Sequence, residues 1–170
     1  MNLRLAEKED LPLLTNWSND PEFFGEFVWF PTQNSRTETA KRYDDLTADN
    51  KWFLLEKKDG TKIGWTGHFL FGSLFEIFYY LLPSERGKGY CTEATRTMVD
   101  YLFMSRNVVR IQAHTDVRNL GSQKVLEKAG FQREGIVRRC LFTRGEWRDF
   151  YLYSILREEW KEPRILTKTM

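Results

Sequence analysis

Cysteine, proline and glycine are scarce in this sequence, and each scarcity excludes a class of protein. Two cysteines, Cys91 and Cys140, are too few for a disulfide framework and lack the number and spacing of a zinc site. With 5 prolines and 11 glycines in 170 residues, the chain is neither collagen-like nor of low complexity. We therefore expect no metal site, and the cysteine content fits a reducing compartment.

The sequence also lacks long apolar runs and a marked excess of one charge. Its longest wholly apolar run, Ile77 to Leu82, is far shorter than the roughly 20 residues of a membrane span. Residues 1–10 have no apolar core of a signal peptide. A formal net charge of +2 is too small for the basic surface that nucleic-acid backbones require. We therefore expect a cytoplasmic protein that binds neither membrane nor nucleic acid.

What is present is the composition of an ordinary globular protein, with 41% hydrophobic, 15% aromatic and 29% charged residues. The length is typical of one domain, which we expect over residues 1–170. Apolar periodicity predicts helices after Asp10, within 36–50, over 89–105 and over 119–129. It predicts strands at 3–5, 52–56, 63–71, 74–82, 108–114, 132–142 and 149–156. This order predicts an α/β (α+β) fold.

A glycine-rich turn joins the strand at 74–82 to the helix at 89–105, and reads Arg86-Gly87-Lys88-Gly89-Tyr90-Cys91-Thr92. Glycines let the main chain approach a ligand closely, and a helix N-terminus points unpaired N–H groups at an anion. A P-loop would need Ser or Thr at Gly89, and a dinucleotide fingerprint would need Gly or Ala at Thr92. The turn is therefore a phosphate cradle of another kind, or simply a turn.

Ordered motifs along the chain resemble the GNAT superfamily of N-acetyltransferases. Arg86-x-x-Gly89-x-Cys91 resembles its acyl-CoA pyrophosphate motif, with cysteine where the family usually has glycine or alanine. Further matches are the strand Glu76 to Pro83, Thr92-Glu93-Ala94, and the segment from Asn119 to Phe131; the end, Gly145 to Trp160, is similar to the RimJ/RimL-type ribosomal-protein branch. The resemblance implies a GNAT fold: a mixed, mostly antiparallel sheet of about six or seven strands flanked by about four helices.

The resemblance implies transfer of an acetyl group from acetyl-CoA to a primary amine, by direct attack, with no covalent enzyme intermediate and no metal. Implied cofactor contacts are the main chain near Tyr80, Leu81 and Leu82, the turn residues Arg86, Gly87, Lys88, Gly89, Tyr90, Cys91 and Thr92, and Asn119. Asn119 also suits the N-cap of its helix, and Gly130 suits the left-handed turn that ends it.

Glu76 is the candidate base, acting directly or through a water. It is the lone charge in an apolar strand, where burial makes a carboxylate a better proton acceptor. The alternative is a glutamate on the solvent face of an edge strand or one paired with an arginine. His68 and His114 qualify by residue type alone, and we expect His114 to be a packed residue.

Ser122 is the candidate acid that protonates the CoA sulfur. Many family members carry a tyrosine three residues further along this helix, where this chain has Val125. Some members of the RimJ/RimL branch use a serine at the place of Ser122. A small residue early in a capped helix explains this serine equally well.

In this family the acceptor cleft lies between the early aromatic segment and the late hairpin, near Trp147. The aromatic segment holds Phe23, Phe24, Phe27, Trp29 and Phe30 with Asp20, Glu22 and Glu26, which suits a cationic amine or simply completes the core.

Three functions stay open: a protein N-terminal acetyltransferase, an acetyltransferase for a small cationic amine (polyamine, amino sugar or antibiotic), and a non-catalytic acyl-CoA-binding module. Expected partners are acetyl-CoA and the amine acceptor, with the chain a monomer or homodimer.

Overall fold

The computed structural model describes residues 1–27 and 33–161, and in this part of the chain seven strands form one sheet. The strand order is β1-β2-β3-β4-β5-β7-β6, antiparallel throughout except between β4 and β5, which are parallel. The strands are β1 (Asn2–Leu5), β2 (Lys51–Glu56), β3 (Lys62–Phe71), β4 (Leu74–Leu81), β5 (Arg110–Asp116), β6 (Gln132–Thr143) and β7 (Glu146–Leu156). The mixed, mostly antiparallel sheet that the sequence predicted is confirmed.

The described helices are one more than the roughly four that a fold of this class led us to expect. They are α1 (Leu11–Asn19), α2 (Pro21–Phe24), α3 (Arg36–Asp44), α4 (Tyr90–Ser105) and α5 (Leu120–Ala129). The additional helix, α2, lies in the aromatic segment that the sequence left irregular. It forms because the Asp20 side chain accepts from the N–H of Glu22 and a proline occupies the first helical position. None of the described helices is long and apolar enough to cross a membrane.

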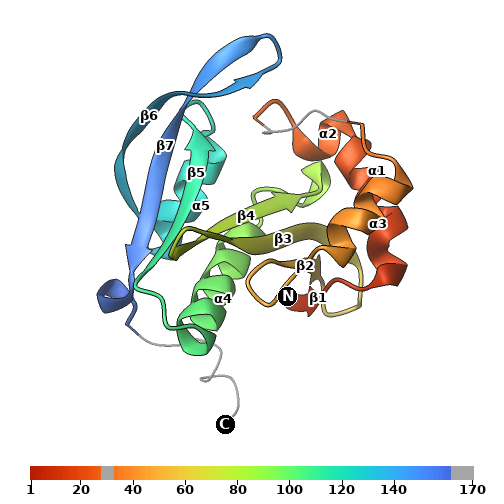
Figure 1. Ribbon diagram of the computed structural model, residues 1–170, viewed down its shortest axis with the longest axis horizontal. Coiled ribbons are helices and arrows are strands. Elements are labelled where there is room, and N and C mark those ends of the chain that lie inside the picture. Colours follow the sequence, from red (N-terminus) through yellow and green to blue (C-terminus); the bar gives the residue numbers. More distant parts are fainter. Residues whose placement is uncertain (28–32, 162–170) are drawn as a thin grey trace.

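Helices cover both faces of the sheet (Figure 1). On one face Met98 and Leu102 of α4 and Leu126 of α5 pack with Phe75 and Ile111 of the central strands. The other face is covered near β2 by α1 and α2, whose buried side chains form a second cluster with the strand: Leu14, Trp17, Phe23 and Leu54. A strand buried on both faces has the near-continuous apolar sequence seen in β4.

The two parallel strands β4 and β5 separate soon after they meet. Their register pairs Phe75 with Ile111 and Glu76 with Gln112, and no later pair is formed within the described strands. Figure 1 shows β4 turning away from β5 and from the strands beyond it. The main-chain groups that would continue the ladder are therefore left beside an opening in the middle of the sheet.

The β6–β7 hairpin is longer than predicted and bends toward α2 (Figure 1). β6 ends at Thr143 and β7 begins at Glu146, so the gap between the predicted strands at 132–142 and 149–156 shrinks to Arg144 and Gly145. Both turn residues have positive φ angles, 51° and 81°, as a two-residue type I′ turn requires. The residues that follow the turn are consequently strand residues, with side chains on defined faces.

Candidate active site

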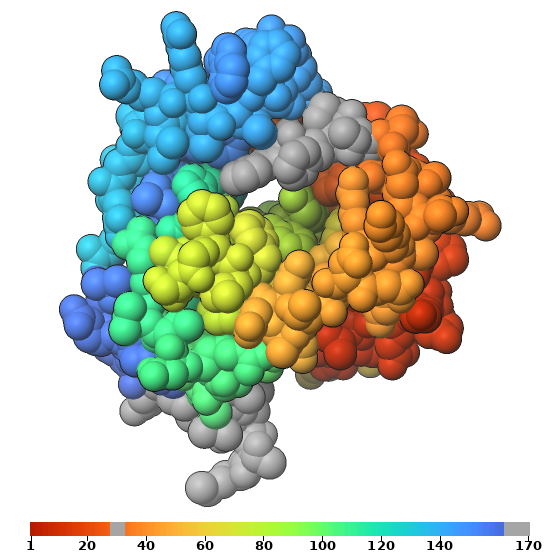
Figure 2. Space-filling model, in the orientation of Figure 1, coloured from red at the N-terminus to blue at the C-terminus, as the bar shows by residue number. Residues whose placement is uncertain are grey.

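A cavity of about 590 Å³ lies where β4 and β5 diverge. It is lined by both strands, by the glycine-rich turn and the first turn of α4, by α5, and by α2 with the residues after it. Figure 2 shows the surface hollowed between the β6–β7 hairpin and the β3 and β4 strands. The volume lies within the roughly 300–1,000 Å³ of small-molecule sites, so the cavity can hold a substrate-sized ligand.

Strand alternation gives the cavity two unlike sides. Successive side chains of a strand point to opposite faces. Tyr79 accordingly contacts Ser122 of α5, whereas Tyr80 packs against Phe23 and Phe24 of α2. We call these two sides the α5 face and the α2 face. Glu76, an even number of residues from Tyr80, lies on the α2 face.

The glycine-rich turn leads into α4 and lines the cavity. Gly87 and Gly89 have φ angles of 78° and 87°, a conformation that side chains rarely adopt, and a Cβ on either would meet no described atom within 4 Å. Helix α4 begins at Tyr90 with no side-chain cap, which leaves its first N–H groups for an anion. Tyr90, Cys91 and Thr92 line the cavity, and burial raises the pKa of Cys91 to about 11. This geometry suits an anion, and phosphate binding by the turn stays a prediction.

The two basic residues of this turn are engaged within the protein. Arg86 donates through Nε to the carbonyl oxygen of Leu81 (3.2 Å) and through Nη2 to that of Phe23 (2.7 Å), and it lines the cavity. Lys88 pairs with Glu85 at 3.0 Å and is not among the lining residues that the structure describes. Arg86 therefore links the end of β4 to α2, and the contribution of both residues to phosphate binding stays a prediction.

The main chain of β4 alternates as its side chains do. The N–H of Leu82 donates to the carbonyl oxygen of Ile63 (2.9 Å), and in an antiparallel ladder every second residue bonds the same neighbouring strand. Tyr80 is therefore bonded to β3 as well, while the main-chain groups of Tyr79 and Leu81 point away from β3, and the carbonyl oxygen of Leu81 accepts from Arg86. The sequence named Tyr80, Leu81 and Leu82 for main-chain contacts; the register offers Tyr79 and Leu81.

Ser122 lies in the first turn of α5, where two of its groups are hydrogen-bonded. Its N–H donates to Oδ1 of Asn119 (3.0 Å), which confirms the predicted N-cap, and Gly130 ends the helix with a φ of 99°. The hydroxyl oxygen of Ser122 lies 2.8 Å from that of Tyr79, and both residues line the cavity. Tyr79 was missed as a side-chain candidate, although its odd spacing from Glu76 places it on the opposite face.

Glu76 is buried, with 6% of its surface exposed, and both carboxylate oxygens have partners. Oε2 accepts from Nε2 of Gln112 and Oε1 lies 2.9 Å from Nδ1 of His114. Of this group, His114 lines the cavity and Glu76 does not. The His114 side chain is 15% exposed, so it is largely packed as expected, and it also borders the cavity because β5 has diverged from β4 at this position.

The sequence contains a signal that could have identified the polar residues of β5 as candidate site residues. Gln112, His114 and Asp116 alternate with Ile111, Ala113 and Thr115, the pattern of a strand with one polar face.

The other histidine, His68, is fully buried beside Phe53, Phe75 and Tyr101, and burial lowers its pKa to about 4. Within residues 1–27 and 33–161, no group of three or more His, Cys, Asp or Glu side chains could hold a metal ion.

Aromatic residues from α2 and just after it line the α2 face. Phe23, Phe24 and Phe27 border the cavity together with Glu26. Phe23 also stacks on Trp17, with ring centroids 4.9 Å apart, so it completes the core as well as the cavity wall. Two further candidates, Trp29 and Phe30, lie outside the described residues. Trp147 makes an edge-to-face contact with Phe142 of the hairpin, is 59% exposed, and is not among the described lining residues.

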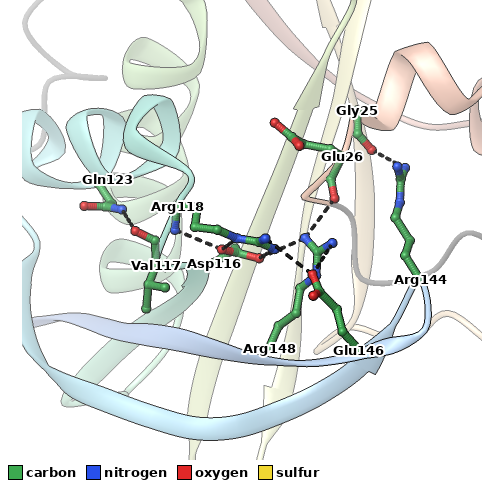
Figure 3. A network of polar contacts seen from close by, with 9 residues as sticks. All are labelled: Gly25, Glu26, Asp116, Val117, Arg118, Gln123, Arg144, Glu146 and Arg148. Atoms are coloured by element: carbon green, nitrogen blue, oxygen red, sulfur yellow. Dashed lines mark hydrogen bonds and ion pairs between the residues drawn. The ribbon is translucent and has the colours of Figure 1, made fainter.

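Asp116 forms a buried ionic contact at the end of β5 (Figure 3). Its Oδ2 accepts from Nη2 of Arg118 (3.0 Å) and from Nη1 of Arg148 (3.2 Å), and 1% of the residue is exposed. Burial alone would raise the pKa of Asp116, but the hydrogen bonds from the two arginines outweigh it and lower the pKa. The carboxylate therefore stays charged and ties β5 to β7.

The β6–β7 hairpin is also bonded to the residues after α2. Arg148 donates to the carbonyl oxygen of Glu26 (3.2 Å), and Arg144 donates to that of Gly25 (2.7 Å). Figure 3 shows the two arginines reaching from the hairpin to this main chain. The hairpin is thus tied at two points to the segment that follows α2.

A mixed sheet that splits around a cavity, with a glycine-rich turn leading into an uncapped helix N-terminus, suits an acyltransferase. The chain belongs to the GNAT acetyltransferase family, since residues 1–132 match its model, described as an acetyltransferase (GNAT) domain. It is 34% identical over 151 residues to the probable N-acetyltransferase YjcK of Bacillus subtilis strain 168, covering 82% of this chain and 83% of that protein. The chain is an N-acetyltransferase.

Two solved structures share the fold. Spermidine N-acetyltransferase from Vibrio cholerae, in complex with CoA and spermine, matches with a TM-score of 0.81 and 24% identity, covering 93% of this chain and 96% of that one. Ribosomal-protein-alanine N-acetyltransferase from Brucella melitensis matches with a TM-score of 0.81 and 19% identity, covering 92% and 99%.

The acyl donor of this family is acetyl-CoA, and the residues present fit it. The two glycines of the cradle, Gly87 and Gly89, leave open space where any Cβ would intrude. The uncapped N-terminus of α4 supplies N–H groups for a pyrophosphate. Lys124 and Lys128, four residues apart on α5, also line the cavity and add positive charge on the same face.

Proposed function

We propose that this enzyme transfers the acetyl group of acetyl-CoA to a primary amine by direct attack, without a covalent enzyme intermediate. One observation carries the proposal: the cavity between β4 and β5 joins the phosphate cradle to the Glu76 and His114 pair on the α2 face. Two substrates can therefore enter from opposite faces of the sheet and meet between the strands. Bound acetyl-CoA would supply an activated thioester there.

The cradle residues Gly87 to Thr92 would hold the pyrophosphate, with Arg86 and Asn119 beside them. The main-chain groups of Tyr79 and Leu81 would hold the pantetheine arm by continuing the ladder that β5 leaves. Lys124 and Lys128 would neutralise further phosphate charge. This assignment keeps the predicted turn residues, Leu81 and Asn119, replaces Tyr80 and Leu82 by Tyr79, and adds the two lysines.

The chemistry also needs two proton transfers. An amine is mostly protonated at neutral pH and must lose a proton before it attacks, whereas the departing thiolate gains one. We propose that the Glu76 side chain takes part in the first transfer on the α2 face. Ser122, with Tyr79 as its hydrogen-bonded partner, would protonate the thiolate on the α5 face.

We infer that the acceptor is a protein N-terminal amine, as in the RimJ/RimL-type branch. Support comes from the similarity of residues 145–160 to that branch, and from the fold shared with the ribosomal-protein-alanine N-acetyltransferase of Brucella melitensis. A small cationic amine is the second candidate. The rings of Phe23, Phe24 and Phe27 with the carboxylate of Glu26 favour it, because aromatic faces and acidic groups attract cations.

The test is release of the CoA thiol from acetyl-CoA with a panel of acceptors. A peptide with a free N-terminus should release thiol, and the same peptide with a blocked N-terminus should not. Release with a polyamine or amino sugar alone would select the second candidate. No release with any amine would overturn the proposed transfer and favour a module that binds acyl-CoA without chemistry.

A further inference from the structure

The carboxylate of Glu76 is separated from the cavity by another proton-exchanging group. Its two oxygens accept hydrogen bonds from the side chains of Gln112 and His114, each at 2.9 Å. Glu76 is 6% exposed and lies behind the cavity lining, while His114 is part of that lining. A substrate amine in the cavity therefore reaches the imidazole before it reaches the carboxylate.

The strand register produces this order. Glu76 lies opposite Gln112 in the last pair that β4 forms with β5. His114 is two residues further along β5, hence on the same face but past the point where the strands separate. The hydrogen bond between His114 and Glu76 therefore lies at the point where β4 and β5 separate. The imidazole ring is on the cavity side of this bond, and the carboxylate is on the other side.

The partners also select the tautomer of the imidazole. Gln112 donates its amide N–H to one oxygen of Glu76, and an ionised carboxylate accepts but does not donate. The Nδ1 atom of His114 is therefore the protonated nitrogen in the neutral ring, and Nε2 has the lone pair. A carboxylate behind Nδ1 orients the ring and stabilises the imidazolium that forms when Nε2 takes a proton.

We propose that His114 is the catalytic base, taking the proton of the acceptor amine at Nε2, and that Glu76 is a positioning residue. The inference rests on the proposed function and deepens it. The amine R–NH₃⁺ gives one proton to Nε2, its nitrogen forms the amide bond as the carbon–sulfur bond breaks, and the thiolate gains a proton. The proton on His114 and the second amine proton leave to the thiolate side and solvent, so one proton is released per turnover.

The charged groups around His114 come from several elements. Glu76 of β4 is in direct contact, Asp116 is two residues along β5 with its partners Arg118 and Arg148, and Glu26 lines the same cavity. Cys140 of β6 lies near Glu76, and burial, together with that charge, raises the pKa of its thiol. Glu76 is therefore the group whose removal should change the proton affinity of His114 most.

The experiment compares kcat/KM against pH for the parent enzyme, His114→Asn and Glu76→Gln, with one accepted amine. The asparagine amide lies near the place of Nδ1 and can still donate to Glu76, so the variant removes proton acceptance at Nε2 alone. We expect kcat/KM of His114→Asn to be about 10²- to 10⁴-fold lower than that of the parent, without the decrease at low pH that protonation of the base causes. We expect kcat/KM of Glu76→Gln to be about 10- to 100-fold lower, with that decrease retained but shifted to lower pH.

Two readouts do not depend on turnover. NMR of histidine-labelled protein, which has two histidines to assign, should show protonated Nδ1 and unprotonated Nε2 in neutral His114. Acetyl-CoA affinity and the thermal unfolding midpoint should be close to parental in both variants. If His114→Asn does not fold, His114→Gln replaces it.

The opposite pattern would overturn the inference. If His114→Asn keeps the decrease at low pH and most of its activity while Glu76→Gln loses both, Glu76 is the base. An NMR spectrum with the proton on Nε2 would also contradict it. A parent enzyme that acetylates no amine instead overturns the proposed function itself, and the inference with it.

Discussion

The hydroxyl oxygens of Tyr79 and Ser122 lie 2.8 Å apart, although one residue belongs to strand β4 and the other to helix α5. The phenol also donates to the main-chain oxygen of Ser122 at 3.3 Å. Burial raises the pKa of Tyr79, so its hydroxyl stays protonated across the range in which enzymes usually work. The pair therefore presents a protonated hydroxyl couple on the α5 face of the cavity.

If Ser122 protonates the leaving thiolate, Ser122→Ala should lower kcat by about 10²-fold or more, with acetyl-CoA affinity nearly unchanged. Tyr79→Phe removes only the hydrogen-bonded partner, and we expect a loss on the order of 10-fold. Steady-state kinetics and calorimetric titration of acetyl-CoA measure the two effects. An unchanged kcat in folded Ser122→Ala would leave the serine with its helix-start role alone.

The cradle can be tested with two glycines of nearly the same backbone conformation. Gly89 has a φ of 87° beside the cavity, and Gly60 has a φ of 84° in the β2–β3 turn; a Cβ meets no described atom within 4 Å at either. Alanine at each position carries a similar strain of roughly 1–2 kcal/mol. We expect Gly89→Ala to weaken acetyl-CoA binding and Gly60→Ala to leave it unchanged, as measured by calorimetry.

Equal loss of stability in these two alanine variants is the internal control. If both destabilise the fold alike and neither changes acetyl-CoA affinity, then no ligand approaches Gly89 closely. That result would remove the turn from the binding site while leaving the fold assignment intact.

Most of the fold could be predicted from the sequence because local signals and tertiary packing agree. The Asn119 cap and the Gly130 stop are short-range features, and each lies where the sequence predicted it. Helix α2 was missed because four residues show no period, and its start depends on the local hydrogen bond from Glu22 to Asp20. The turn between β6 and β7 is shorter than predicted, because the length of each strand depends on its pairing with the other, which cannot be read from local sequence.

The site could be predicted less completely, because contacts between strands of the sheet and with α5 decide which side chains meet. The sequence identified Glu76 and Ser122 as residues of interest, but their partners come from pairing across strands and onto α5. His114 faces the cavity only because β5 leaves β4 after Gln112, a divergence with no local sequence signal. Tyr79 reaches Ser122 across 43 positions of sequence, a relationship that alternation suggests and packing decides.

Asn119 combines a capping role with a place in the cavity lining, and two variants separate these roles. Asn119→Ala should reduce the free energy of unfolding by about 1 kcal/mol, because the N–H of Ser122 loses its acceptor. Asn119→Asp keeps the cap and adds a negative charge beside the cradle, so we expect parental stability with weaker acetyl-CoA binding. Chemical denaturation and calorimetry measure both. Parental affinity in the aspartate variant would show that Asn119 is a cap alone.

The buried carboxylate of Asp116 should make stability depend on pH. Its folded pKa is lowered by the hydrogen bonds from Arg118 and Arg148, which overcome the opposing effect of burial. A group with a lowered folded pKa stabilises the fold above its unfolded pKa, and this contribution is lost as the pH falls through the lowered value. Protonation of Asp116 at acid pH therefore removes the ionic contact between Asp116 of β5 and Arg148 of β7.

Asp116→Asn should accordingly be less stable than the parent at neutral pH, with a difference that narrows as the medium becomes acidic. The asparagine keeps the shape but not the charge, and it removes the buried one of the two ionic partners of Arg148, which is 9% exposed and keeps only its pair with Glu146. Asp45→Asn, an exposed carboxylate at the end of α3, is the matched control and should show little difference at any pH. The measurement is the free energy of unfolding by denaturant across the acid to neutral range. A stability difference that stays constant over that range would mean that Asp116 acts through packing, and that the arginines hold the hairpin without its charge.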